Sequence, residues 1–375
     1  MEIAQNNQND TPSNHNPETN LDNPDGFSDS SKPPAINQKN KTRHIVLLTL
    51  IILLIITVFS FIFVFLYNNY SHSNNKKNVV TINDQTNTKA PSATNDNVWK
   101  SSVNPASLPL GDGHVSSSPM VGYVDSCTTN FKANGASHSG SWINSSNNTW
   151  NSETKPSVEG SINWPSASYS VSTNGSYRTI LTNDLPMNEP TGLFPISLTD
   201  PAYLYDHNPN SIVAQNIDYV LPLNPSASSV PNCTGLGPIG VLNDGVLLFN
   251  ALDASGRDAV AHEIQDLCNG HPDGNNQYHY HDISICIMKQ ATGQSTLVGY
   301  ALDGYGIYVE RDKNGNLPTN SDLDACHGRV SAVMWNGKMT DIYHYDATLE
   351  YPYTIGCFHG TPINTTHNSN KPIHP

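Results

Sequence analysis

The chain has 375 residues and a formal net charge of −14 at pH 7, with 18 Lys plus Arg against 32 Asp plus Glu. An acidic surface repels polyanions, so the composition argues against nucleic acid as a partner. The sequence also has no Walker loop, no dinucleotide-binding glycine fingerprint and no Gly-x-Ser-x-Gly elbow. Nucleotide-binding folds of those types and α/β-hydrolases are therefore not indicated.

The first 97 residues predict a disordered tail, a transmembrane helix and a stalk. Residues 1–44 are rich in Asn, Pro and Ser and contain few apolar side chains to offset the entropy of ordering. Residues 45–67 carry no charge, and as a helix they would extend about 34 Å, enough to cross a hydrocarbon core of about 30 Å. A cleaved signal peptide is the alternative, although no small-residue cleavage site follows the run. Residues 68–97 have the polar composition of a linker.

Basic residues flank the apolar run asymmetrically. Lys39, Lys41 and Arg43 come just before it, whereas the nearest basic residues after it are Lys76 and Lys77. Positive charges next to a span remain on the cytoplasmic side. We therefore expect a single-pass membrane protein with a cytoplasmic N-terminus and an extracellular or periplasmic C-terminal part.

The cysteines agree with an exported C-terminal part. All six follow the apolar run, and their wide spacings resemble neither a zinc ribbon nor a Cys-x-x-Cys redox pair. An even number of cysteines in an oxidising compartment predicts disulfide bonds, and the 15 pairings that six cysteines allow stay open. The six are Cys127, Cys233, Cys268, Cys286, Cys326 and Cys357.

The exported part has the turn residues and short extended segments that are typical of a mainly β protein. Residues 98–176 are rich in Ser, Asn and Gly, with short extended segments at 120–124 and 169–171. Whether this region forms a separate domain or the first strands of the next one stays open. Residues 177–362 form the second part, and residues 363–375 a C-terminal tail.

Two hairpins and one helix are expected in residues 177–362. Asp244-Gly245 and Asn336-Gly337 separate apolar runs, as in tight β-turns. Asp258 can cap a helix that continues to Leu267. The predicted fold is mainly β, with sandwich- or barrel-like sheets and one short helix.

Tyrosine and histidine alternate at Tyr278-His279-Tyr280-His281. On a strand, the two histidines share one face and the two tyrosines share the other. Residues two apart lie roughly 6–7 Å from each other, so both imidazoles can tilt toward one ion at about 2.0–2.1 Å. The run therefore predicts half of a transition-metal site.

A partial second copy of the run occurs at residues 343–346, which makes His344 the expected third ligand. Histidine ligands suit copper or zinc. His271 and His262 are reserve ligands, and Asp282 and Asp346 can orient the imidazoles. The alternative is a metal-free core in which the histidines only exchange hydrogen bonds with neighbouring side chains.

Other chemistry is less well supported. Asp312, Asn314 and Asn316 have calcium-loop spacing, but the glycine and the final glutamate of an EF-hand are missing, so this segment predicts a plain turn. A thiol enzyme based on neighbouring cysteine and histidine residues competes with the expected disulfides. Only Glu263 and Asp303 stand out as candidate general bases, and no reaction or substrate follows from the sequence.

Several motifs in a consistent order resemble the YHYH-domain family over about residues 177–362. The resemblance implies no established activity. It places the family motif on residues 278–281, but Gly306 stands where such domains often have proline, and Asp346 ends the second copy where a histidine would match. The motifs are Ile239-Gly-Val-Leu-Asn-Asp-Gly-Val, Asp266-Leu-Cys-Asn-Gly-His-Pro-Asp, Gln277-Tyr-His-Tyr-His, Gly299-Tyr-Ala-Leu-Asp-Gly-Tyr and Tyr351-Pro-Tyr-Thr-Ile-Gly-Cys-Phe-His-Gly.

The sequence thus predicts a membrane-anchored, outward-facing YHYH domain that binds copper or zinc through His279, His281 and His344, with His271 as a further ligand. The competing hypothesis is a metal-free structural or adhesion module at the cell surface. Its partner would be a protein or a glycan, and the sequence names no small-molecule ligand.

Overall fold

The computed structural model describes residues 100–131 and 138–364, all within the unit Ala90–Pro375. The predicted tail, transmembrane helix and stalk lie outside the described residues, as does nearly all of the predicted C-terminal tail. Among the residues that are described, no helix is long and apolar enough to cross a membrane.

One eight-stranded sheet dominates the architecture and runs in the order β12-β13-β11-β10-β14-β15-β17-β16. Most neighbours are antiparallel, but β11 pairs with β13 and β15 pairs with β17 in parallel. The strands are β10 (Pro238–Leu242), β11 (Leu247–Phe249), β12 (Gly270–Pro272), β13 (Tyr278–Tyr280), β14 (Ser295–Ala301), β15 (Gly306–Glu310), β16 (Gly328–Trp335) and β17 (Lys338–Asp346).

The centre of this sheet is the antiparallel pair β10–β14, in which Gly240 faces Ala301 and Leu242 faces Gly299. The two glycines allow the strands to approach closely. A Cβ atom on Gly299 would lie 2.6 Å from the carbonyl oxygen of Val241, and one on Gly240 would lie 2.9 Å from that of Tyr300. The middle of the sheet therefore requires residues without side chains.

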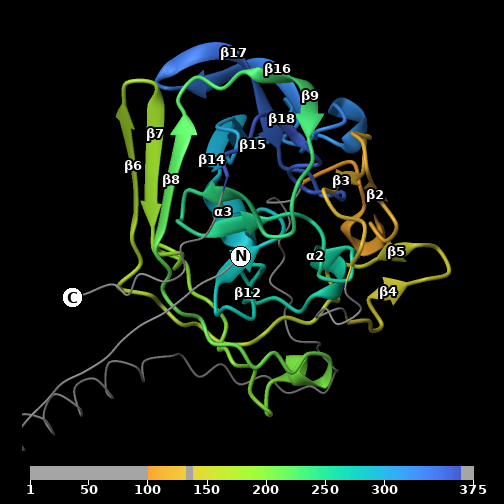
Figure 1. Cartoon of the computed structure of the whole chain (residues 1–375). Coiled ribbons are helices and arrows are strands. Elements are labelled where there is room, and N and C mark those ends of the chain that lie inside the picture. Colours follow the sequence, from red (N-terminus) through yellow and green to blue (C-terminus); the bar gives the residue numbers. More distant parts are fainter. Residues whose placement is uncertain (1–99, 132–137, 365–375) are drawn as a thin grey trace, which may run out of the picture. The chain divides into compact units, whose positions relative to one another are not determined.

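A three-stranded antiparallel sheet packs against the large sheet, and its strands stand side by side in Figure 1. Its strands are β6 (Tyr169–Asn174), β7 (Tyr177–Thr182) and β8 (Ile217–Pro222). Alternate residues of β8 are buried, as expected for a strand with one face on a core. Ile180, Tyr219 and Leu221 join the apolar core that also contains Tyr278 and Tyr280 of β13.

The first part of the described chain contributes short strands to a second core. Leu108, Val124 and Trp150 pack there with Val260 and Tyr353, so residues from both predicted parts share one interior. The elements of this first part are β1 (Leu108–Pro109), β2 (Val115–Ser116), β3 (Val124–Asp125), β4 (Ile143–Asn144), β5 (Thr149–Trp150) and the 3₁₀ helix η1 (Pro105–Ser107). The remaining short elements come later in the chain and are the strand pair β9 (Ala227–Asn232) and β18 (Phe358–Gly360) and the 3₁₀ helices η2 (Pro201–Leu204) and η3 (Asn320–Asp322).

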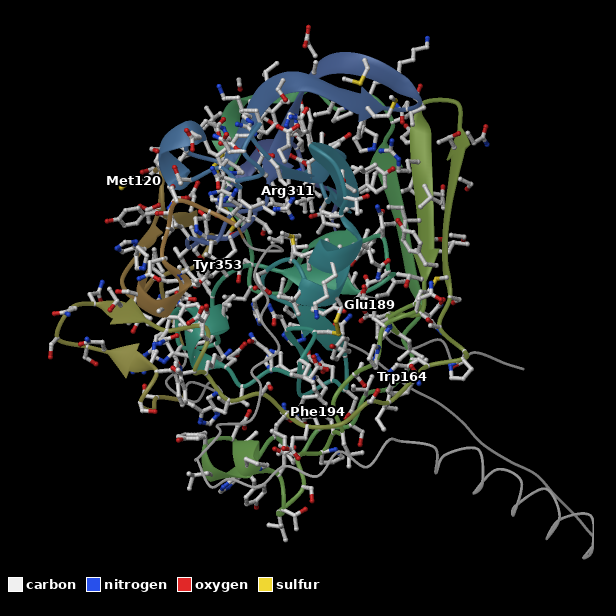
Figure 2. All side chains as sticks on the ribbon, turned by 180° about the vertical axis from the view of Figure 1, so that it is seen from behind. Met120, Trp164, Glu189, Phe194, Arg311 and Tyr353 are labelled. Atoms are coloured by element: carbon white, nitrogen blue, oxygen red, sulfur yellow. A yellow bond between two sulfur atoms is a disulfide. The ribbon has the colours of Figure 1, made fainter. Side chains whose placement is uncertain are left out.

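The α-helices are short. The expected cap is present, since the Asp258 side chain accepts from the amide of Ala261, but helix α2 covers only Ala259–His262. The predicted extension to Leu267 is wrong, because the chain turns into extended backbone at Glu263 and Leu267 is exposed. A second helix, α3 (Ile285–Gln290), was not expected. The side chain of Glu189, labelled in Figure 2, accepts hydrogen bonds from Ser284 and Gln290, which lie at the two ends of α3.

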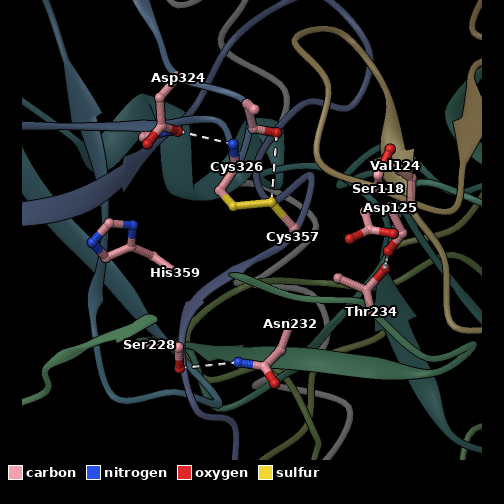
Figure 3. Close-up of a disulfide and its surroundings, with 12 residues drawn as sticks. Ser118, Val124, Asp125, Ser228, Asn232, Thr234, Asp324, Cys326, Cys357 and His359 are labelled. Atoms are coloured by element: carbon pink, nitrogen blue, oxygen red, sulfur yellow. Dashed lines mark hydrogen bonds between the residues drawn. A yellow bond between two sulfur atoms is a disulfide. The ribbon is translucent and has the colours of Figure 1, made fainter. Parts of the chain in front are cut away.

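All six cysteines form disulfides, as predicted, and the structure supplies the pairing. Cys127 joins Cys233, Cys268 joins Cys286, and Cys326 joins Cys357. The last bond is shown in Figure 3, where Asp324 also accepts from the amide of Cys326. Three disulfides indicate an oxidising compartment. The mainly β prediction and both predicted hairpins are confirmed.

The close approach at the sheet centre gives a first prediction. Replacing Gly299 with alanine should lower the free energy of unfolding by about 1–3 kcal/mol, because the central strands must separate to admit the Cβ atom. Chemical denaturation would measure the loss. Gly235→Ala is the matched control, since a Cβ atom there has no neighbour within 4 Å. Equal stability of the two variants would contradict this account of the sheet centre.

Candidate metal centre

Three elements bring four ionisable side chains together. Antiparallel strands β12 and β13 place His271 directly opposite His279. His281 follows β13 on the face of His279, and Glu263 is the residue at which α2 ends. All four are at least 94% buried. We call these four residues the histidine centre.

The donor atoms of the histidine centre converge on one point. Oε2 of Glu263 lies 3.0 Å from Nε2 of His271 and 2.8 Å from Nε2 of His281. Nε2 of His279 lies 3.1 Å from Nε2 of His281. One donor atom from each residue lies within 4.8 Å of all the others. Ligands about 2.0–2.1 Å from a tetrahedral ion are about 3.3 Å from each other, so the group has the dimensions of a metal site.

Two members of the centre have polar atoms that form no hydrogen bond of good geometry. Oε2 of Glu263 and Nε2 of His271 lie 3.0 Å apart as an ion pair, and Nδ1 of His271 is buried without a hydrogen-bond partner. An unsatisfied buried polar atom costs about 1–3 kcal/mol. A shared cation would satisfy Oε2 and one imidazole nitrogen at once, because metal coordination uses lone pairs that point to a common centre.

The rings of β13 are held by their other nitrogens. Nδ1 of His279 lies 3.2 Å from the carbonyl oxygen of Gln277, and Nδ1 of His281 lies 2.5 Å from that of Asn250. A carbonyl can only accept, so each Nδ1 carries the proton and each Nε2 keeps its lone pair for a metal. Phe249 stacks on His279 with the ring centroids 4.0 Å apart, which fixes the plane of that imidazole.

The environment favours a neutral His279 and an ionised Glu263, which are the states that metal ligands need. Burial, and then the neighbouring His271 and His281, hold the pKa of His279 well below its usual value, so this imidazole is neutral. Burial alone would raise the pKa of Glu263, but the adjacent histidines outweigh it and hold that pKa well below the usual range. Burial lowers and Glu263 raises the pKa of His281, with a net increase. Glu263 is therefore an ionised carboxylate next to imidazole side chains.

The tyrosines anchor the opposite face of β13. The Tyr278 hydroxyl donates to Asp266 at 2.8 Å, and the Tyr280 hydroxyl donates to Asp244 at 2.9 Å. Both aspartates also accept from nearby backbone amides, so they shape the turns before β12 and β11. These bonds fix the rotation of β13 and hence the direction of its histidines.

A cavity of about 770 Å³ opens onto the histidine centre, whose four residues all belong to its lining. The Asp206 carboxylate and the His138 imidazole form a polar pair 3.3 Å apart in the wall. No Lys or Arg occurs among the described residues that line the cavity. Its volume suits a small molecule, and its acidic and imidazole groups do not favour an anionic one.

The structure unites three of the four predicted ligands. His271, His279 and His281 belong to the histidine centre, whereas His344 does not and instead lies with Glu310 and Asp346. This corrects the expectation of a third ligand from the second copy of the motif. The reason is the sheet order, since β13 and β17 are separated by β11, β10, β14 and β15.

The other predicted residues have different roles. His262 lies 3.0 Å from the Asp112 carboxylate and contacts the carbonyl oxygen of His138, and it does not belong to the histidine centre. Asp282 accepts from the side chain of Asn269. Glu263 was considered only as a general base. Its place at the end of a very short helix, next to the histidines, could not be derived from a predicted helix that continued beyond it.

A comparison with protein families gives one match. The model described as YHYH protein matches residues 218–318, which include β13 and the whole histidine centre. No curated protein and no solved structure matches the chain.

Asp244 gives a prediction on pH dependence. Burial raises its pKa to about 6, despite the opposing hydrogen bonds from Val246 and Tyr280. The pKa of Asp244 in the folded state is higher than the unfolded value of about 3.9, so the folded protein binds a proton at this carboxyl more tightly than the unfolded chain does. Proton binding therefore contributes to the free energy of unfolding at low pH, and this contribution is lost as pH rises from about 4 to about 6.

In the wild type, the titration of Asp244 should lower the free energy of unfolding by about 2–3 kcal/mol between pH 4 and pH 7, and we expect this decrease to be absent in Asp244→Asn. Urea denaturation at a series of pH values would measure it. Asp218→Asn, at an exposed position of β8, is the control and should leave the profile unchanged. An unaltered profile in Asp244→Asn would show that this carboxyl does not titrate in the range.

Proposed function

Because residues 218–318 carry the YHYH-family segment, we propose that this family motif is part of a metal site in which Glu263, His271, His279 and His281 bind one copper or zinc ion. The observation that carries the proposal is the convergence of four buried donors, one atom of each lying within 4.8 Å of all the others.

The donor set selects the class of ion. Imidazole nitrogens suit zinc and copper, and hard oxygen-seeking ions such as calcium and magnesium prefer carboxylates, carbonyls and water. The carboxylate of Glu263 would neutralise part of the positive charge of an ion bound in this buried centre. An ion held here also faces the cavity, so a small neutral or cationic molecule can reach it.

The protein environment would position that molecule. Phe249 offers an apolar wall beside His279, and the Asp206–His138 pair offers an acceptor and a donor at another part of the wall. We propose ligand binding at this cavity and assign no reaction to it.

The compartment follows from the disulfides and the predicted anchor. Three disulfides support an extracellular or periplasmic location, and residues 45–67 are the proposed single span, with the N-terminus in the cytoplasm. A surface protein or glycan is the proposed macromolecular partner. Copper and zinc are both accessible in such a compartment, where no cytosolic thiol pool competes for them.

The first test is the metal content of residues 98–375, secreted from an oxidising host without a histidine tag. Plasma mass spectrometry should give about one copper or zinc ion per chain, and His279→Ala with His281→Ala should reduce it to the background. The control is His207→Ala, because His207 also lines the cavity but lies outside the centre and is exposed. A folded wild-type protein that takes up no added metal would favour the metal-free surface module.

Glu263 gives an independent test of the ligand set. Glu263→Gln keeps the shape of the side chain but removes its charge, so the dissociation constant for zinc should rise at least tenfold, or about 1.4 kcal/mol. Competition with a chromophoric chelator would measure the change. Gln265→Glu, two residues away and equally buried, alters the charge near but outside the centre and should have a smaller effect. Unchanged affinity in Glu263→Gln would remove this residue from the site.

A further inference from the structure

We infer that the eight-stranded sheet consists of two copies of one four-stranded unit, and that the second copy holds the guanidinium of Arg329 where the first holds a metal ion. The duplication stands on the geometry of the sheet alone. The statement about the ion rests on the proposed function of the histidine centre.

The strand order is symmetric about the central pair. From the middle outward, one half is β10, β11, β13 and β12, and the other half is β14, β15, β17 and β16. Each half contains an antiparallel hairpin, then a parallel pair and then an antiparallel edge strand. Parallel pairs in an otherwise antiparallel sheet are an unusual feature to find twice at matching places.

The registers match residue by residue. In the first half Gly240 faces Leu248, which in turn faces Tyr280. In the second half Gly299 faces Ile307, which faces Tyr345. Both hairpins also have an irregularity one residue before the glycine. Two independent strands would not be expected to share a bulge position.

The tyrosine anchors are duplicated too. Tyr280 donates to Asp244, whose other oxygen accepts from the backbone amide two residues later, and Tyr345 and Asp303 repeat both bonds. Tyr278 donates to Asp266 as Tyr343 donates to Asp324. The four aspartates are thus two pairs of equivalent residues.

The turns into β12 and β16 repeat the same backbone. Asp266 accepts from the amides of Cys268 and Gly270, and Asp324 accepts from those of Cys326 and Gly328. The residue between cysteine and glycine has a positive φ in both turns, 66° at Asn269 and 70° at His327. Each cysteine forms a disulfide with a cysteine that follows the tyrosine strand of its own half. Asp324, Cys326 and the second disulfide are labelled in Figure 3.

The equivalence of the two halves shows which residue of the second half stands at the position of each histidine of the first half. Arg329 faces His344 on the neighbouring strand as His271 faces His279, so Arg329 corresponds to His271. His344 corresponds to His279, and each has an aromatic neighbour from the equivalent strand, Tyr308 and Phe249 respectively. Asp346 then corresponds to His281. Glu310 supplies a second carboxylate from β15.

The resulting group, Glu310, Arg329, His344 and Asp346, is here called the arginine centre. Nη2 of Arg329 lies 2.7 Å from Oε2 of Glu310, and its Nε lies 2.9 Å from Oδ2 of Asp346. Nε2 of His344 lies 3.5 Å from the same Glu310 oxygen. The guanidinium therefore bridges the two carboxylates that a metal would need.

The arginine centre is consequently a closed site. A divalent ion entering between Glu310 and Asp346 would have to displace a fixed positive charge or lie within a few ångströms of it, which Coulomb repulsion opposes. None of its four residues lines the cavity of the histidine centre, and Figure 1 places β16 and β17 at the top of the view, with α2 and β12 in the lower half. Of these two centres in the described part of the chain, only the histidine centre is therefore open to a transition metal ion, although Glu310, His344 and Asp346 also lie within ligand distance of each other.

The test restores the missing ligands. Arg329→His with Asp346→His gives the arginine centre the histidines of the first centre, and equilibrium dialysis against zinc should show one more bound ion per chain than the wild type. Adding His344→Ala to this variant should abolish the gain. Arg329→Lys with Asp346→His is the control, because it keeps the positive charge and should gain none. Circular dichroism and a thiol assay would establish folding and intact disulfides.

Two outcomes would overturn the inference. One is a wild-type protein that binds two zinc ions and loses one in His344→Ala. The other is a folded Arg329→His and Asp346→His variant that binds no more zinc than the wild type. If this variant does not fold, Arg329→Gln replaces it. Removing the guanidinium should then add one bound zinc ion per chain in equilibrium dialysis, and no gain would contradict the inference.

The experiment also separates this inference from the proposed function. If the wild type binds no zinc but the restored variant binds one ion, the histidine centre is not a metal site and the role of Arg329 still holds. If the wild type binds one ion and the restored variant also binds one, the proposed function holds and the role of Arg329 is wrong.

Discussion

The hydrogen bonds from Tyr278 and Tyr280 to buried aspartates are the constraint on which the centre depends. A strand of three residues has little backbone pairing of its own, and a small rotation would turn its histidines away from Glu263. The tyrosine rings belong to the apolar core, while their hydroxyls reach Asp266 and Asp244, which also hold the adjoining turns. One side of the strand is therefore fixed by packing and by polar contacts together, and the strict alternation of side chains directs the other side to the histidine centre.

The other two members of the histidine centre, His271 and Glu263, are positioned by local geometry of a different kind. His271 is opposite His279 because β12 and β13 form a tight antiparallel pair, joined by a turn in which Asp273 accepts from the amides of Asn275 and Gln277. Glu263 comes from the end of α2, whose cap Asp258 also accepts from the Tyr353 hydroxyl, labelled in Figure 2. The centre thus couples the two apolar cores, and its preorganisation comes from residues that are themselves buried and hydrogen-bonded.

Local pattern was sufficient to predict part of this arrangement. Alternation gave the face shared by His279 and His281, turn chemistry gave both hairpins, and cysteine number and context gave the disulfides. The pairing of strands was not predictable, because sheet order depends on contacts between residues far apart in the sequence. The assignment of His344 failed for that reason: a repeated motif was interpreted as two parts of one site, whereas duplication places each copy in its own half of the sheet. The place of Glu263 in the histidine centre was not predicted, because a helix of one turn leaves almost no periodic signal.

The inferred duplication also explains why the second half of the sheet differs from the first at two positions together, Asp346 and Arg329. Asp346 in place of histidine adds a buried negative charge, which would be costly beside Glu310 in a site with no cation. Arg329 in place of histidine adds the positive charge that these carboxylates need, and its planar group can bond both at once. Asp346 without Arg329 would leave two neighbouring carboxylates without this counter-charge, whereas both changes together supply the positive charge from the chain itself. The same fold thus supports one half whose centre opens to a cavity and another whose centre is closed by its own side chain.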